Sequence, residues 1–175
     1  MFRISTKSMV YAGLCLALAL LLPFLTGQLP SIGSAISPMH IPVLLCGFLC
    51  GAPLGAIVGA VAPLLRSVLF GMPPMFPTAT AMAFELCGYG LIAGLCYKLL
   101  PKSLPNVYIA LALAMLGGRI VWGVAMWSLT GGNLTFDAFL ASAFVKAVPA
   151  IILHLVLIPP IVYALQRAHL IPADV

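Results

Sequence analysis

Residues 107–129 read VYIALALAMLGGRIVWGVAMWSL, a run of 23 residues in which Arg119 is the only charged side chain. About 20 predominantly apolar residues cross the hydrocarbon core of a bilayer as one α-helix. A charged residue near the bilayer centre costs roughly 2.5–3.5 kcal/mol on insertion scales, so it faces protein, water or a ligand instead of lipid. The stretch therefore predicts a transmembrane helix that carries a buried polar site.

The composition of the whole chain indicates the same class. Of its 175 residues, 63% are hydrophobic and 6% are charged, whereas soluble domains carry about 25% charged residues. The chain is therefore predicted to be an integral membrane protein. The formal net charge is +5, but five of the eight Lys and Arg residues lie beside the ends of apolar runs, which is typical of an orientation signal. No basic run with interleaved aromatic residues occurs, so we expect no nucleic-acid partner.

Six apolar runs separated by turn signals predict an all-α bundle of six transmembrane helices. Gly and Pro residues at 51–53 and 71–77 interrupt the runs, because neither residue favours the continuation of a helix. We expect one transmembrane domain over residues 1–175, embedded in the lipid bilayer, with spans at about 9–25, 40–49, 54–70, 78–100, 107–129 and 137–167. The alternative of a cleaved signal peptide at the first span is disfavoured, because the run is long for one.

Positively charged residues predict the orientation of the bundle. With six spans, the Lys and Arg residues at or beyond the span ends all fall on one side of the bilayer, and the opposite loops carry none: they are Arg3, Lys7, Lys98, Lys102 and Arg167. Cytoplasmic loops carry such an excess of positive residues. Both termini are therefore predicted to be cytoplasmic.

Four charged residues lie inside the predicted spans: Arg66, Glu85, Arg119 and Lys146. At 1.5 Å per helical residue, they lie roughly 8 to 15 Å inward from the predicted outer ends of their helices. Because four different helices deliver charge to a similar depth, we expect a common polar cavity, with purely structural ion pairing as the alternative. Three of the four are cationic, so mutual pairing leaves two positive charges and predicts an anionic ligand.

Aromatic and polar side chains near these charges extend the predicted site. Tyr89 lies four residues after Glu85, and Trp122 lies three after Arg119, so each pair shares a helix face. An aromatic wall beside fixed charges suits a small organic ion. Interfacial anchoring or helix packing is the alternative for Trp122. His40 begins the second span and is a candidate cap of the cavity, or else a surface histidine without a partner.

Small residues on the first span indicate a partner helix, and several motifs typical of ATPases and metal sites are absent from the sequence. Gly13 and Ala17 lie four residues apart, a spacing that lets two helices approach closely in lipid. No G-x-x-x-x-G-K-[ST] phosphate loop occurs, so ATP hydrolysis by that route requires other subunits. The five cysteines lie in spans as small apolar residues. We expect no cofactor and no metal in this chain, the alternative being a metal site made by Cys46, Cys50 and His40.

Four segments of the chain resemble one transporter family. They are SPMHIPVLLCG at residues 37–47, GAPLGAIVG at 51–59, PLLRS at 63–67 and GMPP at 71–74. Together with the six-helix plan, the short second helix and the long first loop, they resemble the S components of energy-coupling factor (ECF) vitamin transporters over nearly the whole chain.

The resemblance implies a substrate-capture subunit and not an enzyme. An S component of this family binds a vitamin on the outer face of the prokaryotic plasma membrane. It then topples within the membrane against a transmembrane T component, which is driven by two ATPase subunits. Gly13 and Ala17 correspond to the family's Ala-x-x-x-Ala docking motif, with a departure at the first position.

The surplus of Arg and Lys favours an anionic vitamin, and pantothenate is our first expectation. In this hypothesis Arg119 and Lys146 bind the carboxylate, and the guanidinium of Arg offers a bidentate fork that Lys lacks. Glu85 and Asn133 contact hydroxyl and amide groups, and Trp122 packs on the carbon chain of the vitamin.

Several alternatives remain beside this hypothesis. Another vitamin, such as a pyridoxine-type compound, a folate or cobalamin, would change only the pocket. A self-sufficient secondary carrier would transport without ATPase partners, and an inverted repeat would favour it. An intramembrane enzyme would use Glu85, Lys146 or His154 as acid or base. In a capture subunit, the outer loops at residues 30–39 and 71–77 are candidate lids.

Overall fold

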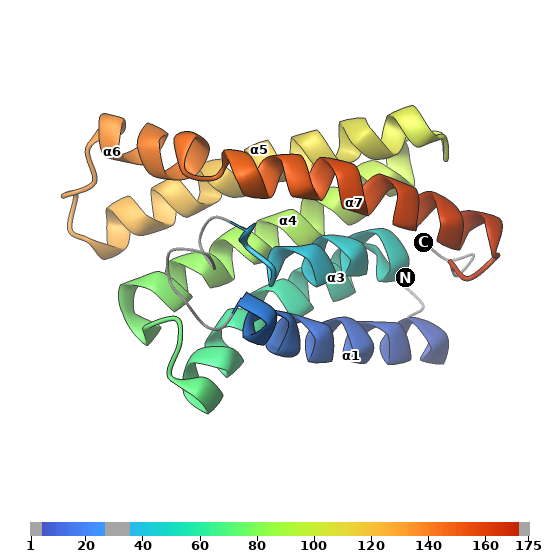
Figure 1. Cartoon of the computed structure of the whole chain (residues 1–175), viewed down its shortest axis with the longest axis horizontal. Coiled ribbons are helices and arrows are strands. Elements are labelled where there is room, and N and C mark those ends of the chain that lie inside the picture. Colours follow the sequence, from blue (N-terminus) through green and yellow to red (C-terminus); the bar gives the residue numbers. More distant parts are fainter. Residues whose placement is uncertain (1–4, 27–35, 172–175) are drawn as a thin grey trace.

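The computed structural model describes residues 5–26 and 36–171, and the regular elements in these ranges are all helical (Figure 1). They are α1 (Thr6–Leu21), η1 (Leu22–Thr26), α3 (His40–Phe70), η2 (Met75–Ala79), α4 (Thr80–Leu99), α5 (Leu104–Leu129), α6 (Phe136–Leu140), η3 (Ala141–Val145) and α7 (Val148–Arg167). η1 is a 3₁₀-helix, whereas η2 and η3 are π-helical segments that lead into α4 and α7.

Five helical segments are long and apolar enough to cross a membrane: Thr6–Leu25, His40–Phe70, Met75–Leu99, Leu104–Leu129 and Phe136–Arg167. The predicted all-α membrane fold is confirmed, but the predicted count of six spans is not. The spans predicted at 40–49 and 54–70 are joined in α3. The first of them is too short to cross alone, since ten helical residues extend roughly 15 Å against a hydrocarbon core of roughly 30 Å.

A reversal at Gly51 explains the shape of α3. Gly51 has φ 82° and ψ 173°, a conformation that glycine adopts readily and that residues with a Cβ atom avoid. On either side of it, Gly47 and Gly55 face each other, and a Cβ atom on Gly55 would lie 2.8 Å from the Cα atom of Gly47. In a straight helix, residues eight apart are separated by about 12 Å along the axis. The two halves of α3 therefore pack against each other.

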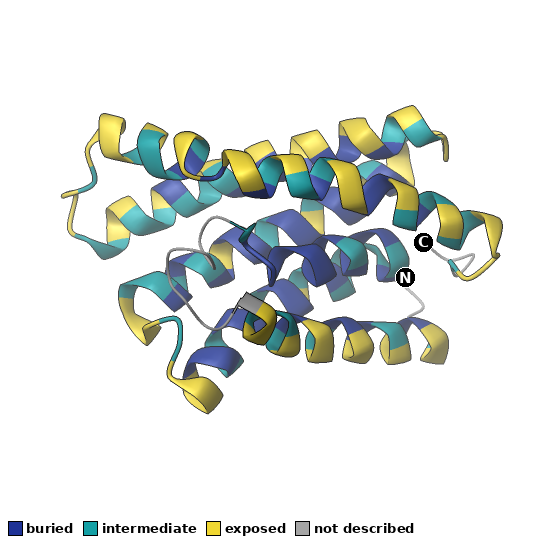
Figure 2. Ribbon diagram, in the orientation of Figure 1, coloured by how far each residue is buried: buried dark blue, intermediate teal, exposed yellow. Residues whose placement is uncertain are grey.

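α3 and α4 form the most extensive helix contact of the bundle, and much of this pair is dark blue in Figure 2. Glycines line the contact. A Cβ atom on Gly47 would lie 2.7 Å, and one on Gly55 2.8 Å, from the carbonyl oxygen of Gly90. On Gly59, a Cβ atom would collide with the carbonyl group of Leu86. We call this contact the glycine seam, and it lets the two backbones touch, as small residues do between helices in lipid.

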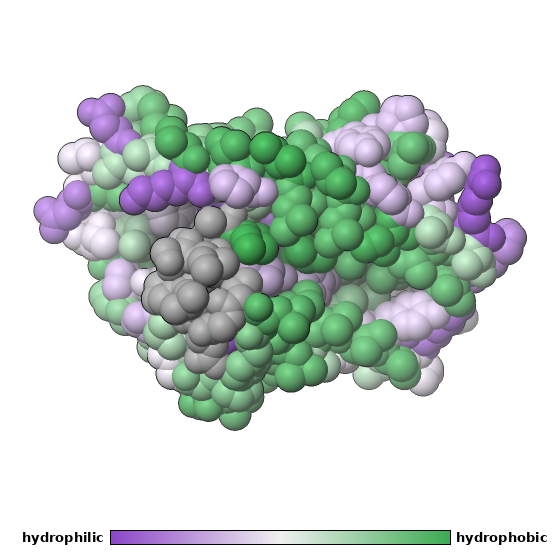
Figure 3. Space-filling model, viewed as in Figure 1, coloured by the Kyte–Doolittle hydropathy of each residue, from purple (hydrophilic) through white to green (hydrophobic). Residues whose placement is uncertain are grey.

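The remaining helices surround the α3–α4 pair and present an apolar outer surface. α1 packs on α3, α5 packs on α4, and α7 packs against α5 and α3. Apolar side chains cover the middle of the molecule in Figure 3, and hydrophilic ones gather toward its two ends. Four of the buried side chains in the described ranges, by contrast, are basic or acidic: His40, Arg66, Glu85 and His154. A polar interior within an apolar exterior is typical of a membrane protein with an internal site.

Candidate functional site

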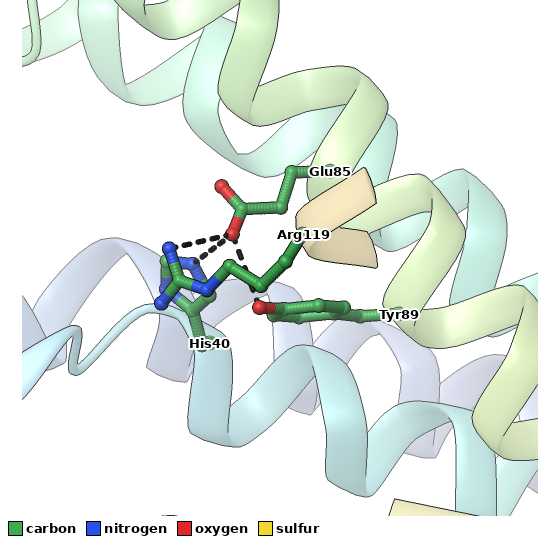
Figure 4. A network of polar contacts seen from close by, with 4 residues as sticks. All are labelled: His40, Glu85, Tyr89 and Arg119. Atoms are coloured by element: carbon green, nitrogen blue, oxygen red, sulfur yellow. Dashed lines mark hydrogen bonds and ion pairs between the residues drawn. The ribbon is translucent and has the colours of Figure 1, made fainter. Parts of the chain in front are cut away.

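A buried carboxylate, that of Glu85, is the centre of a polar cluster shown in Figure 4. Its Oε1 atom lies 3.1 Å from Nη1 of Arg119 and 3.7 Å from Nε2 of His40. The hydroxyl group of Tyr89 donates a hydrogen bond of 3.1 Å to the same oxygen. Side chains from α3, α4 and α5 thus converge on one carboxylate oxygen.

The local sequence accounts for this convergence. Glu85 and Tyr89 lie one turn apart on the same face of α4. On α5, Gly118 precedes Arg119, and a Cβ atom at Gly118 would overlap the ring of Tyr89. The absence of that side chain lets α5 pack closely enough on α4 for Arg119 to reach Glu85. His40 enters from the other side, as the first residue of α3.

α7 adds a second imidazole to the cluster. His154 is 1% exposed and stacks on His40, with ring centroids 6.1 Å apart and an interplanar angle of 21°. The ring of His40 also lies 5.4 Å from that of Tyr89. We call the five side chains His40, Glu85, Tyr89, Arg119 and His154 the Glu85 cluster.

Four buried nitrogen atoms of the Glu85 cluster have no hydrogen-bond partner: Nδ1 and Nε2 of His40, Nε of Arg119 and Nε2 of His154. In the described part of the chain, no other buried side-chain nitrogen or oxygen is in this state. Leaving a buried polar group unsatisfied costs about 1–3 kcal/mol. Groups of this kind call for a functional explanation, and a small polar molecule could supply their partners.

The charges of the Glu85 cluster balance each other when both imidazoles are neutral. Glu85 contributes one negative charge and Arg119 one positive charge. The whole chain has three acidic residues, and among the described residues Glu85 is the buried one, since Asp137 is exposed in the first turn of α6. The cluster therefore does not carry the two surplus positive charges that the sequence predicts for a common cavity.

Arg66, which was predicted to line the same cavity, has a separate set of partners. It is 3% exposed, and its Nη1 donates a hydrogen bond to the main-chain carbonyl of Leu20 near the end of α1. Its guanidinium lies 4.8 Å from the ring centroid of Phe24 and 5.3 Å from that of Phe70. Since Phe24 lies in η1 and Phe70 ends α3, these contacts join the ends of two helices. We call them the Arg66 clasp.

Comparison with known proteins gives the family. The family model described as the substrate-specific component of ECF transporters matches residues 7–162, most of the chain. The chain belongs to this family. No curated protein and no solved structure matches it. As an S component, it is a substrate-binding subunit of a transporter and not an enzyme. Its apolar helices and its family indicate a multi-pass plasma-membrane protein that associates with T and ATPase components.

Three further residues predicted for the binding site of this S component lie outside the Glu85 cluster. Trp122 is half-buried and stacks on Phe139, with ring centroids 6.4 Å apart. Asn133 is exposed, and its Nδ2 donates a 2.9 Å hydrogen bond to the carbonyl of Thr130 within the turn. Lys146 is exposed at the junction of η3 and α7. Its main-chain N–H donates to the carbonyl of Ala141, but its ammonium group makes no hydrogen bond or ion pair with the other described residues.

α1 of the S component exposes the face that carries the predicted docking residues. Gly13 and Ala17 are exposed, and no atom lies within 4 Å of where a Cβ atom of Gly13 would be. The residues of α1 that are buried lie on a different face: Ser8, Ala12, Cys15 and Ala19. The small-residue face is therefore open to a partner helix in the described structure.

His154 is the member of the Glu85 cluster that the sequence did not place in a binding site. The available indication was a polar side chain within an apolar span. From the sequence, His154 was a candidate only as an acid or base of the alternative intramembrane enzyme. The alternative metal site is not supported, since no three His, Cys, Asp or Glu side chains of the described residues are placed to hold a metal ion. Residues 30–35 of the first predicted lid lie outside the described residues.

Proposed function

We propose that this S component captures a small water-soluble vitamin at the Glu85 cluster. The strongest support is the group of four unpartnered nitrogen atoms beside a buried ion pair, where α3, α4, α5 and α7 meet. Small-molecule sites combine apolar and aromatic walls with a few placed polar groups, and the rings of His40, Tyr89 and His154 supply such walls here. The vitamin enters from the outer face, and both termini of the chain lie in the cytoplasm.

Pantothenate is the cargo that we propose first. Its carboxylate would accept hydrogen bonds from Nε of Arg119 and from His40, and its hydroxyl and amide groups would pair with His154. A neutral, hydroxyl-bearing vitamin such as a pyridoxine-type compound is the second candidate. The observation in its favour is that Glu85 and Arg119 already neutralise each other.

Transport in this proposal depends on other subunits. The exposed face of α1 with Gly13 and Ala17 docks on a helix of the T component, because small residues at this spacing permit close backbone contact. Two ATPase subunits hydrolyse ATP, and this chain contributes capture and release of the vitamin.

Calorimetric titration of the purified chain with a panel of water-soluble vitamins tests the capture proposal. One vitamin should bind tightly with one-to-one stoichiometry. His40→Gln should weaken its binding about two- to tenfold, since a lost hydrogen bond to a ligand contributes about 0.5–1.5 kcal/mol. Ser128→Ala, an exposed position on α5, is the matched control and should bind normally. Failure of every vitamin to bind the folded chain would overturn the proposal.

Copurification with the T and ATPase components tests the docking proposal separately. Gly13→Leu should abolish assembly without lowering the thermal stability of the isolated chain, because the site of the new side chain is open. Val68→Leu adds bulk at an exposed position of α3 and should assemble normally. Assembly of Gly13→Leu at the level of the native chain would exclude this face of α1.

A further inference from the structure

The Glu85 cluster has one negative and one positive charge, so a ligand carboxylate would leave it with a net negative charge. The groups that face this point are His40 from α3, Glu85 and Tyr89 from α4, Arg119 from α5 and His154 from α7. Arg119 is the one cation among them, and its Nη1 is already paired with Glu85. A second buried carboxylate beside Glu85 is strongly unfavourable unless another positive charge accompanies it.

His40 is placed to provide that charge by taking up a proton. Both of its ring nitrogens are buried without a hydrogen-bond partner, and Nε2 lies 3.7 Å from Oε1 of Glu85. A protonated imidazole donates from both nitrogens. His40 could therefore donate one hydrogen bond to Glu85 and the other to the carboxylate of the ligand, which would satisfy both orphaned atoms.

His154 limits the uptake to a single proton. Its ring is stacked on that of His40 at 6.1 Å, and its Nε2 also lacks a partner. Two imidazolium rings at this separation would repel each other in a buried site. One added proton is enough to balance one carboxylate, so the two rings act as a pair that accepts one positive charge.

We propose that a carboxylate vitamin binds the Glu85 cluster together with one proton, which the His40–His154 pair takes up. This inference rests on the proposed capture of an anionic vitamin, and it specifies how the negative charge of the ligand carboxylate is balanced in the buried site. The competing source of positive charge is Lys146, which is exposed and lies on the segment that leads into α7. If Lys146 turned inward on binding, no proton would be needed.

Calorimetry in buffers of different ionisation enthalpy separates these possibilities, because it counts the protons that accompany binding. The two probes are pantothenate and pantothenyl alcohol, in which a hydroxymethyl group replaces the carboxylate. Pantothenate should take up about one proton and lose up to about tenfold in affinity from pH 7 to pH 8, the dependence of a one-proton linkage. The alcohol should bind without proton uptake and without this pH dependence.

Three variants complete the test. His40→Gln should abolish the proton uptake and weaken pantothenate more than the alcohol, and binding of the alcohol reports that the site is folded. If that variant fails to fold, His40→Asn serves the same purpose, since it also replaces the imidazole with an amide that cannot take up a proton. Lys146→Gln should leave the proton uptake unchanged.

The outcomes distinguish this inference from the proposed function. Pantothenate binding with no proton uptake would overturn the inference alone, and loss of that binding in Lys146→Gln would assign the compensating charge to Lys146. Binding of the alcohol but not of pantothenate at any pH would overturn both the inference and the anionic cargo. If neither probe binds the folded chain, the proposed cargo fails and the inference fails with it.

Discussion

Two arginines of the described residues lie inside the helix bundle, Arg66 buried and Arg119 largely so, and their surroundings differ in kind. Arg119 faces a carboxylate at 3.1 Å and keeps one nitrogen, Nε, without a partner. Arg66 faces no carboxylate: its partners are the carbonyl of Leu20 and the rings of Phe24 and Phe70. In the described ranges, none of the unpartnered buried atoms belongs to Arg66.

The difference shows that a buried charge in a membrane helix does not by itself identify a ligand site. The Arg66 clasp uses the hydrogen-bonding and ring-stacking capacity of a guanidinium to join two helix ends. Leu20 lies in the last turn of α1, where main-chain carbonyls lack helical partners. The Glu85 cluster, by contrast, retains unused hydrogen-bonding capacity. We therefore propose a structural role for Arg66 and a binding role for Arg119.

The largest effect is expected for Arg119→Met. This change leaves the Glu85 carboxylate buried without its cation, and breaking a buried ion pair from one side costs about 3–5 kcal/mol. Thermal and chemical unfolding of the purified chain in detergent would measure the loss. The double variant Arg119→Met/Glu85→Gln should recover much of it, since no lone charge remains. Equal losses in the single and double variants would show that an uncompensated carboxylate is not the source of the loss.

Arg66→Met should cost less, about 2–3 kcal/mol, because it removes a hydrogen bond and two ring contacts but leaves no charge behind. The same unfolding assay measures it. Arg66→Lys should recover part of the loss, since an ammonium can donate to Leu20 but cannot stack as a planar group. If Arg66→Met proved as costly as Arg119→Met, or if it abolished vitamin binding in a folded chain, the contrast between the two arginines would not hold.

Tyr89→Phe sharpens the description of the Glu85 cluster. It removes only the hydroxyl that donates to Glu85, so a loss of about 1.5 kcal/mol is expected for a hydrogen bond to a charged group. Unfolding of the variant, compared with Tyr108→Phe on α5, gives the measurement. A loss no greater than that of the control would place the Tyr89 hydroxyl outside the network.

Phe24→Leu should have the smallest effect, about 0.5–1 kcal/mol, because it weakens one of the two cation–π contacts of Arg66 and retains apolar bulk. In the Arg66→Met background the same change should cost less, as the cation is gone. This double-mutant cycle measures the interaction free energy between the ring of Phe24 and the guanidinium of Arg66. Additive losses would mean that the ring contributes packing alone.

Much of the fold could be predicted from the apolar runs, because a span long enough to cross a bilayer leaves few alternatives to a helix. The predicted span at 107–129 lies within α5, which begins at Leu104. The count of spans was not predictable in the same way. Gly51 marks a reversal, but only the packing of Gly47 on Gly55 shows that the first half of α3 is a short arm folded against the second.

The candidate site was predictable in part. Glu85 and Tyr89 form a local pair on one helix, so their spacing was enough to join them. Counting residues from the helix ends also predicted a similar depth for Arg66, Arg119 and Lys146. Depth alone does not decide whether two side chains meet. The rotation of each helix about its axis and the choice of neighbouring helix decide it as well. Both depend on how the helices pack. The packing brings Arg119 to Glu85, whereas Arg66 contacts the end of α1 and Lys146 is exposed.

The glycine seam bears on which parts of the protein can move. The backbones of α3 and α4 touch in the glycine seam, so no side chains lie between them that could change rotamer as the helices slide. α3 and α4 should therefore move as one rigid unit. α6, none of whose residues is buried, and α7, which packs at the edge of this unit, have fewer restraints. Amide hydrogens of α3 and α4 should thus exchange slowest. Since His154 belongs to α7, movement of that helix away from α3 would separate the two histidines and expose the Glu85 cluster.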